Sequence, residues 1–256
     1  LGVALPNQPT KLNIALAYIR IKWLLQFKSY QDLEAGKPMT NDRMKAVILI
    51  FNNFGPSIFH ASPTLFPLMI LRSMEIIIKH GVNNYAIPMF AGYGLLESAT
   101  NKFDSGYIFG NISLRLLESV EGSKSIKSRT LITYYNFIHH WQSHLRLSIE
   151  KFNDAYHLAL ESGDNLFAAA ALFLNTSHSY IAGENLEALS SKSEQFHSKI
   201  KSINQGTYVL YHSIFCQTIE NLTKSKSGHN QLAGGYFKEA DNPNLIGLDN
   251  TAIFHV

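Results

Sequence analysis

Charged residues are scarce in this sequence of 256 residues. Lys, Arg, Asp and Glu make up 16% of it, against about 25% in typical domains, and the formal net charge is only +3. The tightest basic group, Lys124, Lys127 and Arg129, lies in a Ser-rich segment and forms no stripe. These features argue against nucleic acid as a partner. A surface with so few charges instead indicates that other domains or chains cover part of it.

Cysteine is nearly absent, since Cys216 is the only one. A single cysteine excludes an internal disulfide framework and fits a reducing compartment, so we expect a cytoplasmic protein. Phe215 and Ile219 flank it in an apolar segment, which predicts a buried thiol. A nucleophilic thiol would need a base beside it, and the sequence pattern names none.

Long uninterrupted apolar runs are also missing. Residues 46–71 contain no charged side chain, but a membrane-spanning helix needs about 20 continuous apolar residues. This segment is broken by amides, Ser, Gly and Pro, namely Asn52, Asn53, Gly55, Pro56, Ser62, Pro63 and Pro67. We therefore expect two buried helices joined by a turn, and no membrane insertion. Because the sequence begins at Leu1 without Met and ends in the apolar run 253–256, we expect a piece of a longer protein.

A convincing strand pattern is absent as well, whereas apolar residues recur at helical spacing along the chain. Thr10 can cap the first helix, and Gly81 can end the third. The predicted helices are 11–28, 42–54, 63–80, 83–100, 105–119, 125–144, 146–161, 165–181, 186–203, 206–224 and 235–240. We expect residues 1–224 to form one helical repeat domain. Residues 225–256 would be a Lys-, Ser- and Gly-rich connector with the start of a further helical element.

Small residues repeat at a spacing that favours close contact between helices. Gly106, Gly110 and Ser113 share one helix face, and Gly94 precedes them on the neighbouring helix. The same spacing returns 42 residues later as Ser148, Phe152 and Ala155. This pattern predicts an all-α fold, specifically a tetratricopeptide-like superhelix of antiparallel helix pairs, although that repeat is usually about 34 residues long. An irregular helical bundle is the alternative.

Three histidines form the most suggestive chemical cluster. His140 and His144 are four residues apart on the predicted helix 125–144, so they would share one face and could chelate zinc, with His139 beside them. A third ligand on that face and a nearby carboxylate are not evident, so we expect interior hydrogen bonding rather than a metal. A metal-dependent helical enzyme using these three histidines stays an alternative. The glycines at 92–94 and 106–110 lack the flanking features of a phosphate loop.

Aromatic residues are crowded on the same predicted helix. Tyr134, Tyr135, Phe137 and Trp141 cannot all face one core, so some of them should reach the surface. We take Tyr134, Tyr135 and Trp141 as a possible interaction surface. We assign no catalytic, cofactor-binding or metal-binding residue.

Several segments in order along the chain resemble a known family. They are 1–6 with Pro9, 39–42, 63–68, 79–81, 91–94, 106–110, 116–118, 137–145, 155–156 and 160–164. In these stretches the chain resembles the helical middle region of very large multidomain signalling proteins. Those proteins join a Ser/Thr-kinase-like domain, an AAA-like predicted ATPase, this helical region, a GAF domain and often a histidine kinase. His139 and Gln142 depart from the basic residues expected at those positions.

The resemblance implies a non-catalytic scaffold or sensor module of a signal-transduction ATPase or kinase. Its partners would be other domains of the same chain or other proteins. ATP would serve the parent chain, an ATP-binding histidine or Ser/Thr kinase, and no cofactor is expected in this piece. A free-standing peptide-binding adaptor is the alternative reading.

Overall fold

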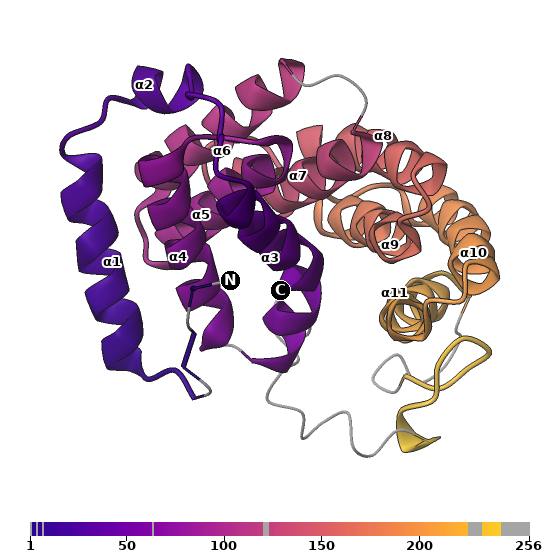
Figure 1. The fold of residues 1–256 in the computed structure, drawn as a ribbon. Helices are drawn as coiled ribbons and strands as arrows, with labels where there is room; N and C mark the ends of the chain where they lie inside the picture. Colours follow the sequence, from indigo (N-terminus) through magenta and orange to yellow (C-terminus); the bar gives the residue numbers. More distant parts are fainter. Residues whose placement is uncertain are drawn as a thin grey trace. The chain divides into compact units, whose positions relative to one another are not determined.

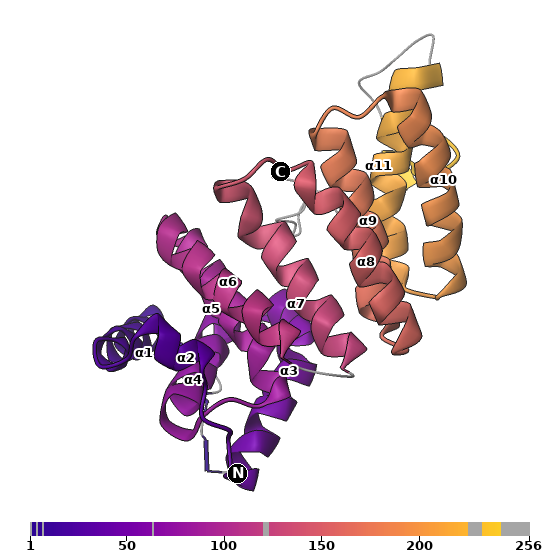
Figure 2. The same ribbon diagram turned by 90° about the horizontal axis from the view of Figure 1, so that it is seen from above.

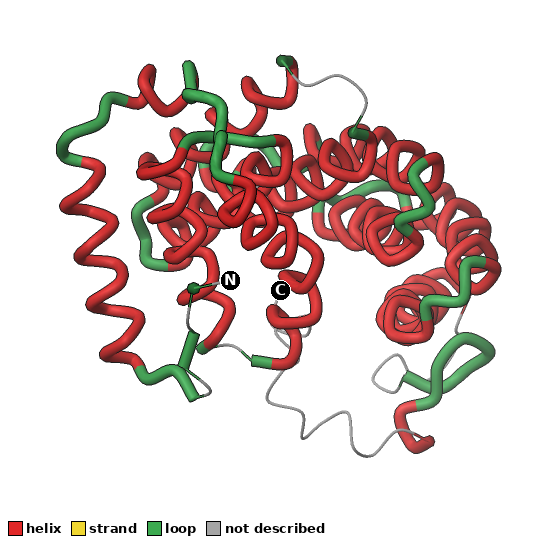
Figure 3. The backbone as a smooth tube through the Cα atoms, in the orientation of Figure 1, coloured by secondary structure: helices red, strands yellow, loops and turns green. Residues whose placement is uncertain are grey.

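The computed structural model describes residues 2–3, 5–6, 8–62, 64–119, 123–224 and 232–241. Within these residues the chain forms eleven α-helices and three short 3₁₀ helices, and Figure 3 shows no strand. β-type pairing in this part of the chain is limited to two isolated bridges, Pro38–Val82 and Ala233–Lys238. The predicted all-α class is therefore confirmed. The chain divides into two compact units, Leu1–Gln142 and Ser143–Val256.

The first unit contains seven α-helices, seen from indigo to magenta in Figure 1. They are α1 (Lys11–Leu25), α2 (Tyr30–Glu34), α3 (Asp42–Ala61), α4 (Leu65–His80), α5 (Ile87–Ala99), α6 (Phe103–Glu118) and α7 (Lys124–Phe137). Short 3₁₀ helices at Asn84–Ala86 and His139–Trp141 precede α5 and follow α7. The short helix α2 was not predicted, although Ser29 and Asp32 form a capping box at its start, a signal that the sequence carries.

The core of this unit is built around α4 and α5, whose sequences are apolar on most faces. Met69, Phe90 and Tyr93 are fully or almost fully buried there, together with Phe109 of α6. The rings of Tyr93 and Phe109 meet edge to face with centroids 4.6 Å apart. α5 lies between α4, α6 and α7, which explains why nearly all of its residues are buried.

Glycine brings α5 and α6 into contact at backbone distance. A Cβ atom on Gly94 would lie 2.7 Å from the Gly106 carbonyl oxygen and 2.8 Å from Ile138 Cδ1. A Cβ atom on Gly110 would lie 2.6 Å from the ring of Tyr134. Ser113, also buried, donates its hydroxyl to the Gly110 carbonyl at 2.6 Å. Side chains at these glycines would therefore force the helices apart.

The prediction that Gly55-Pro56 ends a helix is wrong, because α3 continues through both residues to Ala61. An interior proline cannot donate a backbone hydrogen bond to the carbonyl four residues earlier, which here belongs to Asn52. Arg129 of α7 donates to that carbonyl instead, with Nη1 2.9 Å from the oxygen. A long-range contact thus replaces the missing helical bond.

The predicted helix 125–144 is also too long, since α7 ends at Phe137. Ile138 leaves the helical backbone conformation, with φ −124° and ψ −51°, and its side chain is fully buried against Gly94 and Gly110. Burial of this side chain outweighs continuation of the helix. The Trp141 indole N–H, 3.2 Å from the Phe137 carbonyl, satisfies one of the acceptors left at the helix end.

The second unit contains four α-helices joined by the short turns 162–164, 182–185 and 203–205. They are α8 (Leu147–Glu161), α9 (Asn165–Ile181), α10 (Leu186–Ser202) and α11 (Gly206–Lys224), visible together in Figure 2. Gly163 and Gly183 have positive φ angles of 72° and 71°, which glycine adopts without strain and which end α8 and α9. Consecutive helices that touch across such turns run antiparallel.

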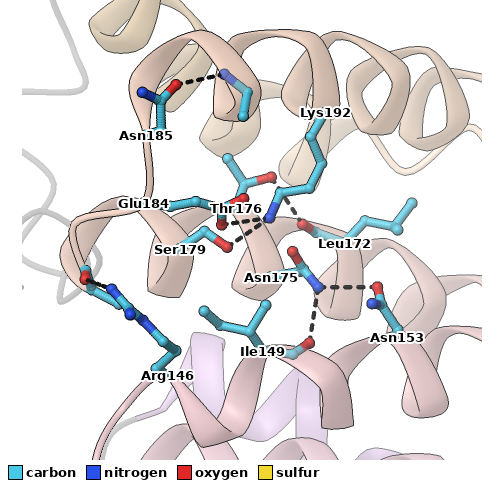
Figure 4. Close-up of polar contacts among 12 residues, drawn as sticks. Arg146, Ile149, Asn153, Leu172, Asn175, Thr176, Ser179, Glu184, Asn185 and Lys192 are labelled. Atoms are coloured by element: carbon cyan, nitrogen blue, oxygen red, sulfur yellow. Dashed lines mark hydrogen bonds and ion pairs between the residues drawn. The ribbon is translucent and has the colours of Figure 1, made fainter.

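The helices of this unit are tied by buried polar contacts as well as by apolar packing (Figure 4). Asn175 of α9 donates to the Ile149 carbonyl at 2.9 Å and to Asn153 Oδ1 at 3.0 Å, both on α8. Lys192 of α10 donates to Ser179 Oγ at 2.8 Å and to Glu184 at 2.7 Å. These contacts fix the register between neighbouring helices.

The residues expected to form the second copy of the repeat lie on α8. Ser148, Phe152 and Ala155 are buried, and the ring of Phe152 meets that of His178 with centroids 4.8 Å apart.

The boundary expected near residue 224 adjoins residues 225–231, which lie outside the described residues, as do 242–256. The helix predicted at 235–240 is wrong, because residues 232–238 form a turn and only Glu239–Asp241 is a 3₁₀ helix.

Candidate interaction surface

The outer face of α1 is the largest run of exposed apolar side chains on a single helix in the described chain. Its members recur three or four residues apart and are between 57% and 68% exposed. They are Leu12, Leu16, Ile19 and Trp23 on the helix and Phe27 just after it. The rings of Trp23 and Phe27 meet edge to face at 5.1 Å. We call this set the α1 stripe.

The opposite face of α1 fixes the helix against the first unit. Ala17 and Ile21 are buried there, and α1 lies beside α4 at the edge of the unit in Figures 1 and 2. Arg20 Nη2 is 2.7 Å from a carboxylate oxygen of Glu75. This helix is therefore apolar on two faces, of which the unit covers one. Helical spacing predicted the helix but could not tell which face would be buried.

An ion pair between half-buried Lys22 and buried Glu97 holds α1 to α5. Lys22 Nζ donates to Glu97 Oε2 at 2.6 Å, and the Glu97 side chain is fully buried. Burial raises the pKa of this carboxyl, but hydrogen bonds from Lys22, Ser105 and Tyr18 outweigh it, so the net pKa is lowered. Glu97 therefore remains ionised at neutral pH. The position of the α1 stripe is set by a contact that is costly to break.

The charges close to the α1 stripe are mostly basic, although Asp32 lies near Lys28. Residues 1–31 contain four basic residues and no Asp or Glu. Arg20 and Lys22 are paired with carboxylates of the unit, as described above, whereas Lys11 and Lys28 are exposed near the two ends of the stripe. The surface therefore combines an apolar centre with a polar rim in which basic residues predominate, and an apolar centre with a polar rim is the arrangement found at protein interfaces.

The three aromatic residues predicted as an interaction surface do not share one environment. Tyr134 is only 2% exposed and its hydroxyl donates to Asn111 Oδ1 at 3.1 Å, so it is a core residue and not a surface contact. Tyr135 is half-buried. Trp141 is 50% exposed, and its ring stacks on Phe103 with centroids 4.3 Å apart. Tyr135 and Trp141 remain candidates.

The predicted histidine face is not formed. α7 ends before His139, so His140 and His144 do not lie one turn apart on a helix. His139 is buried and His140 is half-buried, and desolvation lowers the pKa of both. His144 is exposed, and its Nδ1 accepts from the backbone N–H of Arg146 at 3.1 Å. The zinc-enzyme alternative based on these residues loses its geometric basis.

Cys216 is 2% exposed, which confirms the predicted buried thiol. The expectation that no base accompanies it is wrong, because Nδ1 of His212 lies 3.1 Å from Sγ. The signal was available, since His212 and Cys216 are four residues apart on α11. Burial raises the pKa of the thiol to about 12 and lowers that of His212 to about 3. The pair is therefore neutral at pH 7, which does not suit a nucleophile.

The described residues thus define an all-helical protein with an exposed apolar helix face. In a comparison with curated proteins, the chain is similar to the hybrid signal transduction histidine kinase G of Dictyostelium discoideum, with 24% identity over 148 residues. The match covers 57% of this chain but only 4% of that protein. No family model and no solved structure matches the chain. Among the described residues, no helix is sufficiently long and apolar to cross a bilayer.

Proposed function

We propose that this chain is a non-catalytic helical scaffold module of a large signalling protein, and that the α1 stripe binds another domain of the same protein. The observation that carries the proposal is the stripe itself, an apolar face on a helix that is held rigidly on its other side. The similarity to a signal transduction histidine kinase supports the signalling context. A tetratricopeptide-like arrangement, a cytoplasmic location and an ATP-binding kinase as parent are parts of the same proposal.

The partner we propose is an amphipathic helix with Asp or Glu beside its apolar face. Positions three and four residues apart are the spacing by which two helices interdigitate. The exposed ammonium groups of Lys11 and Lys28 would meet acidic residues at the rim, which gives orientation more than affinity. Trp23 and Phe27 are the expected anchors, because large aromatic side chains dominate the energy of many interfaces.

The magnitude of burial is sufficient for a specific contact. Complete burial of a large apolar side chain contributes about 1.5–3 kcal/mol. The five side chains of the stripe are more than half exposed, so covering them would contribute on the order of 5 kcal/mol before the costs of association. Contacts of this size are strong when the two partners are already linked in one chain.

Hydroxyl-radical footprinting can test this contact. The 256-residue chain and the longer parent protein would be compared at Trp23, with Tyr85, which is exposed and lies outside both candidate surfaces, as an internal reference. We expect Trp23 to be protected in the parent protein only. Equal reactivity of Trp23 in both proteins would contradict the proposal.

A matched pair of substitutions tests the consequence for signalling. Trp23→Glu in the parent protein should change kinase or ATPase output, whereas Leu160→Glu should not, since Leu160 is an exposed apolar residue on α8 and lies outside the α1 stripe. Output unchanged by Trp23→Glu, with the fold intact, would overturn the proposal. A concentration-dependent dimer of the 256-residue chain, or its flotation with anionic vesicles, abolished by Trp23→Glu, would identify a different occupant and also reject it.

A further inference from the structure

Three metal-ligating side chains meet in the interior of the second unit. They are His197 of α10 and His212 and Cys216 of α11, with exposures of 5%, 0% and 2%. One ligand atom from each lies within 4.8 Å of the others. Two of them are four residues apart on one helix and the third comes from the neighbouring helix, so the cluster bridges α10 and α11. Within the described residues, it is the one place where three such groups converge.

The hydrogen bonds around His212 fit a tautomer that can bind a metal. Thr176 of α9 donates its hydroxyl hydrogen to the Leu172 carbonyl, a contact drawn in Figure 4, at 3.3 Å. The same oxygen is 2.9 Å from His212 Nε2, and Nδ1 is 3.1 Å from the Cys216 sulfur. In the tautomer whose Nε2–H donates to Thr176, Nδ1 presents a lone pair to the cluster. In the other tautomer, Nδ1–H donates to the sulfur while the thiol donates to the Ser193 carbonyl at 3.8 Å. A histidine that donates one ring N–H to a fixed acceptor is the usual arrangement of a metal ligand.

Hydrogen bonding at Nδ1 does not account for the burial of His197. Its Nδ1 is buried and has no hydrogen-bond partner, a costly condition in a protein interior. The ring is stacked on that of His212 at 5.6 Å and meets the edge of the Tyr236 ring at 5.3 Å. A cation bound through Nδ1 would satisfy this nitrogen.

We propose that His197, His212 and Cys216 bind a thiophilic metal ion of the Zn²⁺ or Cu⁺ class. Metal–nitrogen and metal–sulfur bonds of about 2.0 and 2.3 Å place ligand atoms roughly 3.3–3.5 Å apart. Side-chain rotations that close the widest separation by about 1 Å would therefore bring the three ligands to bonding distance of one ion. Imidazole and thiolate exclude the oxygen-preferring ions Mg²⁺ and Ca²⁺. On binding, the Cys216 thiol loses its proton to solvent and the sulfur donates an electron pair to the ion.

The surrounding charges are mixed. Burial and the charges of Glu194 and Glu220 raise the pKa of the Cys216 thiol, and burial and the charge of Lys201 lower the pKa of His197. The two carboxylates favour a cation in the cluster, and the ammonium opposes it. Tyr236 also belongs to the turn 232–238, whose backbone N–H groups at Tyr236 and Phe237 bond to Gln217 Oε1. The ion would thus join α10 and α11 beneath this turn and couple metal supply to the rigidity of the second unit.

The first measurement uses the unmodified chain and does not depend on variants. The metal-free, reduced 256-residue protein is titrated with Zn²⁺ against a chromophoric chelator, and with Cu⁺ under anaerobic conditions. We expect one tightly bound ion per chain and a rise in Tm. Replacement by Co²⁺ should give a near-ultraviolet sulfur-to-cobalt charge-transfer band. If neither ion binds, or if the cobalt complex lacks this band, the cluster is only a polar core contact and the proposal fails.

Substitutions then assign the ligands. Cys216→Ser and His197→Gln should weaken binding by more than the roughly 10- to 100-fold that loss of a supporting group causes. Thr176→Val, which removes only the partner of Nε2, should fall within that range. His144→Gln is the control, because this exposed histidine lies outside the cluster. Binding that survives Cys216→Ser, or is weakened equally by His144→Gln, would overturn the assignment. Should the ligand variants misfold, protection of the Cys216 thiol from alkylation by bound metal in the unmodified chain decides the matter.

Discussion

The proline inside α3 allows a quantitative test of how a long-range contact sustains a helix. Pro56 leaves the Asn52 carbonyl without its helical donor, and Arg129 supplies a replacement at 2.9 Å. A hydrogen bond from a charged donor contributes about 1.5–3 kcal/mol. Because Arg129 is only half-buried, we expect Arg129→Met to lower the free energy of unfolding by about 1–2 kcal/mol. Methionine retains most of the apolar stem, so the change removes the guanidinium group, including its longer contact with Asn53 Oδ1 at 3.5 Å.

A double-mutant cycle separates this contact from other roles of Arg129. Pro56→Ala restores a backbone N–H that can donate to Asn52, so Arg129→Met should cost less than half as much in that background. Urea unfolding followed by tryptophan fluorescence is suitable, because Trp23 and Trp141 both lie in the first unit. The coupling should exceed about 0.5 kcal/mol. Equal costs of Arg129→Met in both backgrounds would refute the reasoning.

The remaining predictions concern helix contacts, the buried ion pair and the histidines. Gly110→Leu should lower Tm, because its side chain would collide with the ring of Tyr134. Overpacking costs about 1–3 kcal/mol, more than the gain of up to about 1 kcal/mol in helix propensity. An unchanged Tm would contradict the predicted collision. Lys22→Met should destabilise by about 2–4 kcal/mol at pH 7, since it strands the Glu97 carboxylate. The lowered pKa of Glu97 means that the pair stabilises the fold above the unfolded carboxyl pKa of about 4.3 and is lost as the pH falls below it. The difference in free energy of unfolding between wild type and Lys22→Met should therefore shrink as the pH is lowered. A difference that stays constant with pH would show that the ion pair is not its source. His140→Ala should leave the metal content unchanged by elemental analysis.

The sequence predicted helix positions best where local signals mark both ends. The bounds of α9 and the start of α11 coincide with the prediction, and Gly163 and Gly183 flank α9 with the positive φ angles expected of helix ends. Prediction failed where distant residues decide the outcome. α3 passes Pro56 because Arg129 lies against it, and α7 ends early because Ile138 enters the gap left by glycines of other helices.

The two candidate sites also differ in how much of each can be predicted from the sequence. The periodic apolar residues of α1 were evident in the sequence, but a helix that is apolar on two faces does not reveal which face stays exposed. Only the positions of Ala17 and Ile21 in the core, and the ion pair of Lys22, turn the α1 stripe outward. In the second unit, the spacing of His212 and Cys216 is a local signal that points to one helix face. Its third member, His197, comes from α10, and no spacing rule within α11 could supply it. Local periodicity can therefore identify half of a bridging site, whereas the partner helix follows only from the fold.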